Sequence, residues 1–214
     1  MYRILKIILG VLGSLLLVIG FVVVVFLLEM KPDKEEEEKI KLQAEQYLED
    51  RFDDNFEIYD AFYDNMGNFN FEYAAMARDK GSSTQFFIYY DEGTNQLVDT
   101  YIADKWEDDL EDEIRPFVKE YFGETTNMLV FIGDKNIGQE LDINPLEPRS
   151  YKEFNVTPTI RITVPRKRND RDEKMLDEFI SFLKSDSKLQ HGSVIMGYVA
   201  ENGAILNDEW SKKF

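Results

Sequence analysis

The chain has 214 residues, of which 42 are acidic and 25 are basic, and its formal net charge is −17. A field of that sign repels nucleic acid and anionic lipid surfaces, so we expect no nucleic-acid partner. The chain has no cysteine and one histidine, which excludes disulfides, thiolate nucleophiles, zinc–cysteine sites and histidine-rich metal sites.

Residues 7–28 are an unbroken run of uncharged, mostly branched apolar residues. A helix of that length measures roughly 33 Å, which is enough to cross the hydrocarbon core of a bilayer. No small-residue cleavage pattern follows the run. The sequence therefore predicts a retained transmembrane anchor over residues 7–28, so that the membrane itself is one partner.

The orientation of this anchor is predicted from its flanks. Arg3 and Lys6 precede it, but several lysines follow it, so the positive charges alone do not decide. A short tail before an apolar run and a long acidic domain after it is typical of a signal anchor. We expect a single-pass cell-membrane protein with a cytoplasmic N-terminus and the soluble part outside; an inward-facing domain is the alternative.

The first half of the soluble part predicts a helix, an antiparallel meander and a second helix. Asp33 caps the first helix, which continues to about Phe52. Alternating aromatic residues predict strands at 56–62, 69–75, 85–90 and 97–101, separated by turn residues. The second helix covers 102–121, with Pro116 expected to kink or interrupt it and Gly123 as its stop.

The second half is less regular. Strands are expected at 128–132 and 160–164, then a helix capped by Asn169 or Asp170. A hairpin of residues 194–199 and 204–206 ends the chain. The predicted fold class is α+β: one N-terminal transmembrane helix, then antiparallel sheets packed by amphipathic helices, in one domain or two subdomains. The predicted boundaries are a tail at 1–6, the anchor at 7–28, and soluble parts at 29–124 and 125–214.

Three short stretches carry a resemblance to a known group: Tyr89-Tyr90-Asp91, Val98-Asp99-Thr100-Tyr101 and Lys105-Trp106-Glu107. With them, residues 33–123 resemble uncharacterised single-pass extracytoplasmic proteins of low-GC Gram-positive bacteria. Their helix-plus-curled-sheet outline is similar to cystatin-like and PepSY-like modules. The resemblance implies an extracytoplasmic, non-enzymatic or regulatory role and supplies no functional residues.

Two segments are candidate sites. Oxygen-bearing side chains at alternate positions, Asp134, Asn136, Glu140 and Asp142, are a weak pattern for calcium. A hairpin turn with one polar side explains the same spacing, and no cofactor is expected. Arg166, Lys167, Arg168 and Arg171 form the one basic cluster of the chain and are the candidate partner-binding residues. The alternative for this cluster is a solvated connection between a strand and a helix.

Two functions follow from these patterns. The leading hypothesis is a membrane-anchored extracytoplasmic binding or regulatory module without catalytic residues, which engages a protein or a cell-envelope partner. The alternative is an anchored hydrolase of cell-wall or glycan substrate that uses carboxylate pairs, with calcium as a possible aid. A carboxyl group with a raised pKa in a deep cleft would favour the hydrolase.

Overall fold

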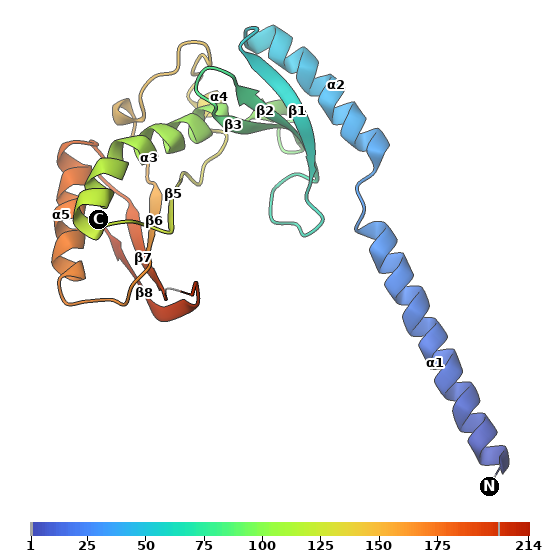
Figure 1. Ribbon diagram of the computed structural model, residues 1–214. Helices are drawn as coiled ribbons and strands as arrows, with labels where there is room; N and C mark the ends of the chain where they lie inside the picture. Colours follow the sequence, from blue (N-terminus) through green and yellow to red (C-terminus); the bar gives the residue numbers. More distant parts are fainter. Residues whose placement is uncertain (1, 201) are drawn as a thin grey trace.

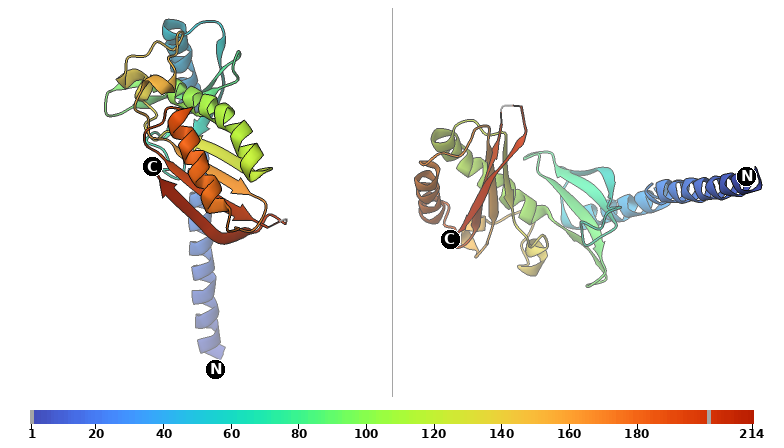
Figure 2. Two further views of the ribbon diagram at one scale, coloured as in Figure 1. Left: turned by 90° about the vertical axis from the view of Figure 1, so that its left-hand side faces the viewer. Right: turned by 90° about the horizontal axis from the view of Figure 1, so that it is seen from below.

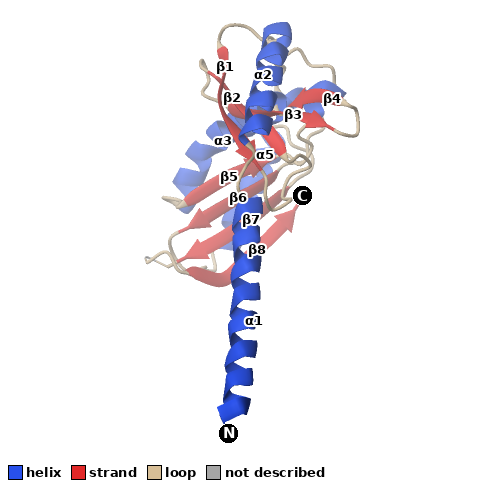
Figure 3. Ribbon diagram, turned by 90° about the vertical axis from the view of Figure 1, so that its right-hand side faces the viewer, coloured by secondary structure: helices blue, strands red, loops and turns tan. Residues whose placement is uncertain are grey.

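The computed structural model describes residues 2–200 and 202–214, without the side chains of residues 3–9, 11, 27–29 and 207. Its fold class is α+β, with two four-stranded sheets joined by a long helix. The chain begins with α1 (Tyr2–Glu29), which extends away from the rest of the molecule (Figure 1). The second sheet lies behind α1 in the view of Figure 3.

The predicted transmembrane helix is corrected by this structure. A helix, α1, does form over the predicted segment. The side chains described in α1 are those of Tyr2, Gly10 and residues 12–26. All of these are exposed except that of Val25, which is half-buried. Within the described residues, no helix has both the length and the apolar character that a membrane crossing requires. The fold class is therefore α+β without the predicted span, and the predicted location and orientation stay predictions.

The first sheet follows the predicted meander. Strands β1 (Phe56–Tyr63), β2 (Tyr73–Asp79), β3 (Gln85–Asp91) and β4 (Gln96–Asp99) pair in chain order, all antiparallel. Helix α2 (Lys34–Arg51) covers one face, and the predicted cap is confirmed because Asp33 accepts the backbone amide of Glu35 at 2.8 Å. Its buried residues, Ile40, Ala44 and Leu48, are spaced by one helical turn and pack on the sheet.

One predicted strand is shorter than expected. The alternation of Phe69, Phe71 and Tyr73 predicts a strand from residue 69, but β2 begins only at Tyr73. Residues 64–72 instead form a loop, because the carboxylate of Asp64 accepts the backbone amides of Met66 and Phe69 at 3.1 and 2.7 Å. Those bonds replace the pairing that a strand would need.

The long helix α3 (Tyr101–Phe122) is continuous through Pro116, so the predicted interruption is wrong. Proline has no N–H group, so Pro116 cannot donate the helical hydrogen bond to the carbonyl of Asp112. Both residues are exposed, so water can satisfy that carbonyl. The opposite face is buried before and after the proline, at Ile114 and Val118. The predicted stop is confirmed, because Gly123 caps the helix at φ 82°.

The second sheet is mixed, and this corrects the prediction of purely antiparallel sheets. Its strands are β5 (Asn127–Phe131), β6 (Thr159–Val164), β7 (Ser193–Val199) and β8 (Ile205–Lys213), in that order. Strand β6 runs parallel to β7, since α5 (Asp172–Ser185) returns the chain between them. The remaining elements are the short helices α4 (Ile137–Glu140) and η1 (Tyr151–Glu153).

Helix α3 runs from the first sheet to the second (Figures 1 and 2), and one buried core includes residues of both sheets. It contacts β3, β5, α4 and α5, and Trp106 in its second turn is fully buried. The indole nitrogen of Trp106 donates a 2.6 Å hydrogen bond to the carbonyl oxygen of Arg149, which satisfies its polar group. The hydrophobic core therefore includes residues from both sides of the predicted boundary at residue 124. The strands of the first sheet all precede this boundary in the sequence, and those of the second sheet all follow it.

Candidate binding site at the junction of the two sheets

The loop of residues 64–72 places aromatic rings on the face of the first sheet that α2 does not cover. Alternate residues of a strand point to opposite faces, so Ile88 faces the main core while Phe87 and Tyr89 face the loop. Phe71 packs against Phe87 and Tyr89 with ring centroids 5.6 and 4.4 Å apart. Phe69 stacks on Phe71 at 5.1 Å. These contacts form a second, separate aromatic cluster.

Asp64 holds this loop in shape from a buried position. It is 7% exposed, and its backbone amide also donates to the carbonyl of Glu72 at 2.8 Å, which closes the loop. Desolvation acts to raise the pKa of the Asp64 carboxyl, but the backbone amides of Phe69 and Met66 outweigh it and keep this pKa below its usual value. The rings at 69 and 71 are therefore presented by an ordered loop.

A pocket of about 270 Å³ lies between this aromatic cluster and the edge of the second sheet. Most of its wall is aromatic: the rings come from the loop, from β3 and from the end of β5. Four polar side chains, from the loop, α3, its N-cap and the segment after β5, complete the wall. The lining residues are Phe69, Asn70, Phe71, Phe87, Tyr89, Thr100, Asp104, Phe131 and Lys135. We call this hollow the aromatic pocket.

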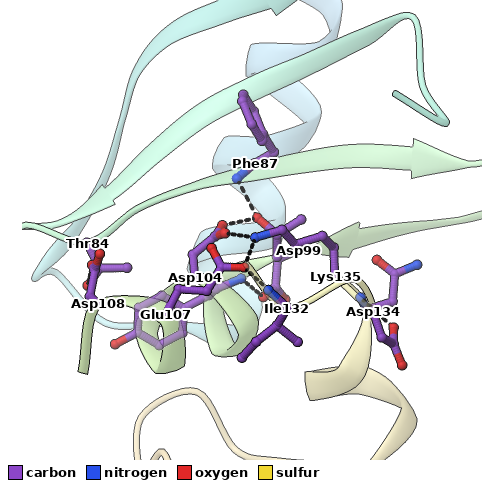
Figure 4. A network of polar contacts seen from close by, with 12 residues as sticks. Thr84, Phe87, Asp99, Asp104, Glu107, Asp108, Ile132, Asp134 and Lys135 are labelled. Atoms are coloured by element: carbon purple, nitrogen blue, oxygen red, sulfur yellow. Dashed lines mark hydrogen bonds and ion pairs between the residues drawn. The ribbon is translucent and has the colours of Figure 1, made fainter. Parts of the chain in front are cut away.

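Beside the aromatic pocket lies an ion cluster of three half-buried residues, Asp104, Glu107 and Lys135 (Figure 4). The Nζ of Lys135 donates to Oδ1 of Asp104 and to Oε1 of Glu107, each at 2.6 Å. The second oxygen of Asp104 accepts the hydroxyl of Thr100, and Oε1 of Glu107 also accepts the backbone amide of Ile132 at 2.5 Å. One lysine therefore bridges two helical carboxylates and fixes the segment after β5 to α3.

The cluster has strongly perturbed protonation equilibria. Burial raises the pKa of Glu107 to about 7, against the opposing effects of Lys135 and the Ile132 amide. Burial also raises the pKa of Asp104. For Lys135 burial acts to lower the pKa, but the two carboxylates outweigh it and raise this pKa. A carboxyl that titrates near neutrality is common in catalytic sites and in structural ion networks.

A second buried carboxylate, Asp99, ties three elements together near the same junction. Its Oδ2 accepts the hydroxyl of Tyr47 at 2.7 Å and the side-chain amide of Gln139 at 2.6 Å. These bonds join α2 and α4 to the end of β4. Burial raises the pKa of Asp99 and, with the nearby carboxylate, that of Tyr47. Asp99 does not line the aromatic pocket and is best explained as structural.

A second and larger hollow lies on the other side of residues 69–71. Its volume is about 700 Å³, and it runs between the first turns of α2 and the loop. It is lined by Glu36, Lys39, Ile40, Gln43, Asp64, Gly67, Phe69, Asn70, Phe71, Glu72, Tyr73, Tyr90 and Glu92. We call it the acidic groove, since four of these residues are acids and one is basic.

The residues of the predicted calcium pattern are not gathered around a common point. Asp134 accepts the backbone amide of Asn136 at 3.2 Å, and the side-chain oxygen of Asn136 accepts the hydroxyl of Tyr89 at 2.8 Å. Glu140 and Asp142 lie at the exposed end of α4. No group of three or more acidic or histidine side chains with metal-binding geometry occurs among the described residues. The pattern is explained by a turn in which Asn136 supports the pocket residue Tyr89.

The predicted basic cluster is divided by the fold. Arg166 makes a bidentate ion pair with the fully buried Asp172, at 2.9 and 2.7 Å, and Asp172 also accepts the hydroxyl of Tyr198. Lys167, Arg168 and Arg171 are exposed, and Arg168 lies over the ring of Trp210 at 4.5 Å. One member of the cluster is therefore structural and three face solvent.

Neither hollow is predicted by the sequence. The alternation of Phe69 and Phe71 favours a strand, and Asp104, Glu107 and Lys135 form no motif because acids are abundant in the chain. The available signal was Asp64-Asn65-Met66-Gly67-Asn68, a run of turn residues long enough for a loop. Lys135 alone could not be paired with α3 before the position of β5 was known.

Comparison with known proteins finds structural similarity but no matching family model or curated sequence. No family model matches the chain, and no curated protein matches it significantly. Among solved structures, the chain is similar to a DUF5037 family protein from Ruminococcus gnavus ATCC 29149, with a TM-score of 0.42 and 13% sequence identity. The match covers 76% of each chain. This weak likeness to a member of an uncharacterised family supplies no function.

Proposed function

We propose that the chain is a non-catalytic binding module, and that the aromatic pocket receives an apolar side chain of a protein partner. The observation that supports this most directly is the composition of the pocket wall: five aromatic rings with a few polar groups at one end. Concave, mostly apolar hollows with a few fixed polar groups are the usual form of binding sites. Among the described residues, Phe131 at the pocket edge is 53% exposed, so its ring is accessible to a partner.

The size of the pocket also fits one side chain. A dry apolar cavity of about 150 Å³ in another protein accommodates benzene. The aromatic pocket, at about 270 Å³, is large enough for the ring of a phenylalanine, tyrosine or tryptophan. Aromatic rings from the partner would gain from edge-to-face contacts with Phe71 and Phe87 as well as from burial.

The alternative function is a hydrolase that uses the carboxyls of Asp104 and Glu107. Its support is the pKa of Glu107, about 7, which suits a general acid or base. Against it, Glu107 does not line the aromatic pocket, and its carboxylate is engaged by Lys135 and by the Ile132 amide. A carboxyl in that setting is better explained as the anchor of the segment after β5.

The binding proposal is tested by photocrosslinking in the native cells with the full-length chain. A photoreactive phenylalanine is placed at position 131 or, as the matched control, at Leu129, which is also exposed on β5 but does not line the pocket. We expect a discrete protein adduct from position 131 that is absent from position 129. Identical adducts from both positions, or none from position 131, would contradict the proposal.

A separate assay addresses the hydrolase. The purified wild-type chain and the Glu107→Gln variant are incubated with cell-wall glycan, and soluble fragments are measured. If the wild type releases fragments and the Glu107→Gln variant does not, the chain is a hydrolase and the binding proposal is wrong. We expect no release from either.

A further inference from the structure

We infer that the acidic groove binds a cationic segment of the partner, that is, a stretch of peptide rich in lysine or arginine. The inference rests on the proposed binding function and specifies the chemistry of the partner. The groove and the aromatic pocket share the residues Phe69, Asn70 and Phe71, so the two hollows flank one loop. A partner that enters one hollow therefore passes beside the other.

The first argument is the charge of the groove. Glu36, Asp64, Glu72 and Glu92 face a single basic residue, Lys39, and that lysine already pairs with Glu36 at 2.8 Å. Glu72 and Glu92 are exposed, and neither has a basic partner within 4 Å among the described residues. The net charge of the groove is therefore negative, in keeping with the −17 of the whole chain. A cationic partner is complementary to it, and nucleic acid or an anionic lipid surface is not.

The second argument is the set of aromatic rings in the same groove. The large side chains of Phe69 and Tyr90 are each 46% exposed. The ring of Tyr73 also lines the groove. Guanidinium and ammonium groups bind to the faces of such rings, and they also pair with carboxylates. The rings of the groove, together with Glu72 and Glu92, therefore offer an arginine or lysine side chain both kinds of contact. A calcium ion would use the carboxylates alone and would leave the rings unoccupied.

The third argument is the shape of the groove and its support. Its volume of about 700 Å³ exceeds the needs of a single ion and corresponds to several side chains. One wall is α2, whose first turn is fixed by the Asp33 cap and by a 2.9 Å bond from the Asp33 amide to the hydroxyl of Tyr73. The other wall is the loop that Asp64 orders, together with Tyr90 and Glu92 at the end of β3. Both walls are formed before a partner arrives, which lowers the entropic cost of binding.

The test uses a synthetic dodecapeptide of alternating arginine and glycine as the probe. Binding to the full-length chain is measured by isothermal titration calorimetry at 50 mM and 300 mM salt. A nonionic detergent is present because the described apolar side chains of α1 are exposed. We expect saturable binding that weakens at least fivefold at the higher salt, since the contacts include exposed charges.

Two double variants of equal charge change separate the groove from the general field of the protein. Glu72→Gln with Glu92→Gln removes two charges from the groove; Asp112→Asn with Glu124→Gln removes two charges from exposed sites on and after α3. We expect the groove pair to weaken binding about five- to tenfold and the α3 pair less than twofold. Tyr90→Leu, which keeps the charge but removes a ring, is expected to weaken binding about threefold.

Equal losses in the two double variants would overturn the inference, because the attraction would then be that of the whole acidic surface. Absence of binding at 50 mM salt would overturn it as well. Displacement of the probe by 1 mM calcium chloride, with no effect of Tyr90→Leu, would assign the groove to a cation instead. A discrete adduct from position 131 without peptide binding would retain the binding function and remove only the cationic segment.

Discussion

Lys135 lies 31 residues from Asp104 in the sequence, yet its Nζ is 2.6 Å from the Oδ1 of that residue and equally close to Glu107. This relationship connects the segment after the first strand of one sheet to the helix that begins beside the other sheet (Figure 4). The lysine supplies a positive charge to two half-buried carboxyls, so it stabilises the junction and sets the polar end of the aromatic pocket.

Removing this lysine should therefore destabilise the whole fold. Lys135→Met leaves the half-buried Asp104 and Glu107 without a cation, and this loss should cost about 1–3 kcal/mol, between the values for exposed and fully buried pairs. Urea denaturation followed by tryptophan fluorescence measures the free energy of unfolding. Lys119→Met is the matched control, because its ion pair with Glu124 is exposed and should cost less than about 0.5 kcal/mol. Equal losses in the two variants would show that the bridge is dispensable.

Glu107 predicts a pH dependence of stability whose sign can be worked out. Its pKa rises from 4.5 in the unfolded chain to about 7 in the fold, so the folded state binds more protons between those values. Its contribution is fully present below about pH 4.5 and is lost as the pH rises through about 7. Relative to Glu107→Gln, the wild type should lose up to about 3 kcal/mol between pH 4.5 and pH 7.5.

This comparison is made by urea denaturation at several pH values. Glu120→Gln, an exposed residue of the same helix, serves as the control and should follow the wild type throughout. If the difference between the wild type and Glu107→Gln stays constant over this range, Glu107 does not titrate near neutrality.

Gly138 marks a close approach of α4 to α3. A Cβ atom at position 138 would lie 2.8 Å from Cγ1 and 2.9 Å from Cβ of Ile102, which is closer than such atoms pack. Gly138→Ala should therefore destabilise by about 1–3 kcal/mol, although alanine favours helices over glycine. Gly133→Ala is the control, because the nearest atom to its added Cβ is 3.9 Å away. Thermal unfolding of the two variants measures the difference, and a neutral Gly138→Ala would refute the close packing.

The basic cluster should divide into structural and surface residues. Arg166→Ser removes the ion pair of Asp172, which is fully buried, and should cost about 3 kcal/mol of unfolding free energy. Lys167→Ser, next to it and exposed, should cost less than about 0.5 kcal/mol. Burial acts to raise the pKa of Asp172, but Arg166 and the Asn169 amide outweigh this effect, and the pKa lies below its usual value of 3.8. The stabilisation that this carboxylate contributes should therefore be lost only as the pH falls below 3.8. If Arg166→Ser abolishes partner binding and Lys167→Ser does not, the loss should therefore be attributed to unfolding.

The capacity of the aromatic pocket can be measured with a free ring. Indole, as a probe for a tryptophan side chain, should cause saturable amide shifts at Phe87, Thr100 and Lys135 in NMR spectra. Phe131→Ala should weaken this binding about threefold or more, since one ring of the wall is lost. Leu129→Ala removes a side chain of similar exposure from the same strand and should have no effect. Equal effects of the two substitutions would place the probe outside the pocket.

The sequence by itself determined the elements whose signal is local. Asp33 and the spacing of Ile40, Ala44 and Leu48 were enough to predict α2, since capping and helical periodicity depend on neighbours within one turn. The meander of β1 to β4 followed from alternation and turn residues for the same reason. The net charge of the chain likewise needed no structure, and the expectation of no nucleic-acid partner rests on it alone.

The tertiary structure decided whatever depends on residues far apart in the chain. The alternation at Phe69 and Phe71 predicted a strand, but the amides of the 64–72 loop bind the Asp64 carboxylate, so the rings form a pocket wall instead. Pro116 remained within α3 because burial of the opposite face outweighs one lost hydrogen bond. Lys135 acquired its partners only when α3 and β5 came together, since an ion pair forms through space and leaves no periodic pattern in a sequence with 42 acids.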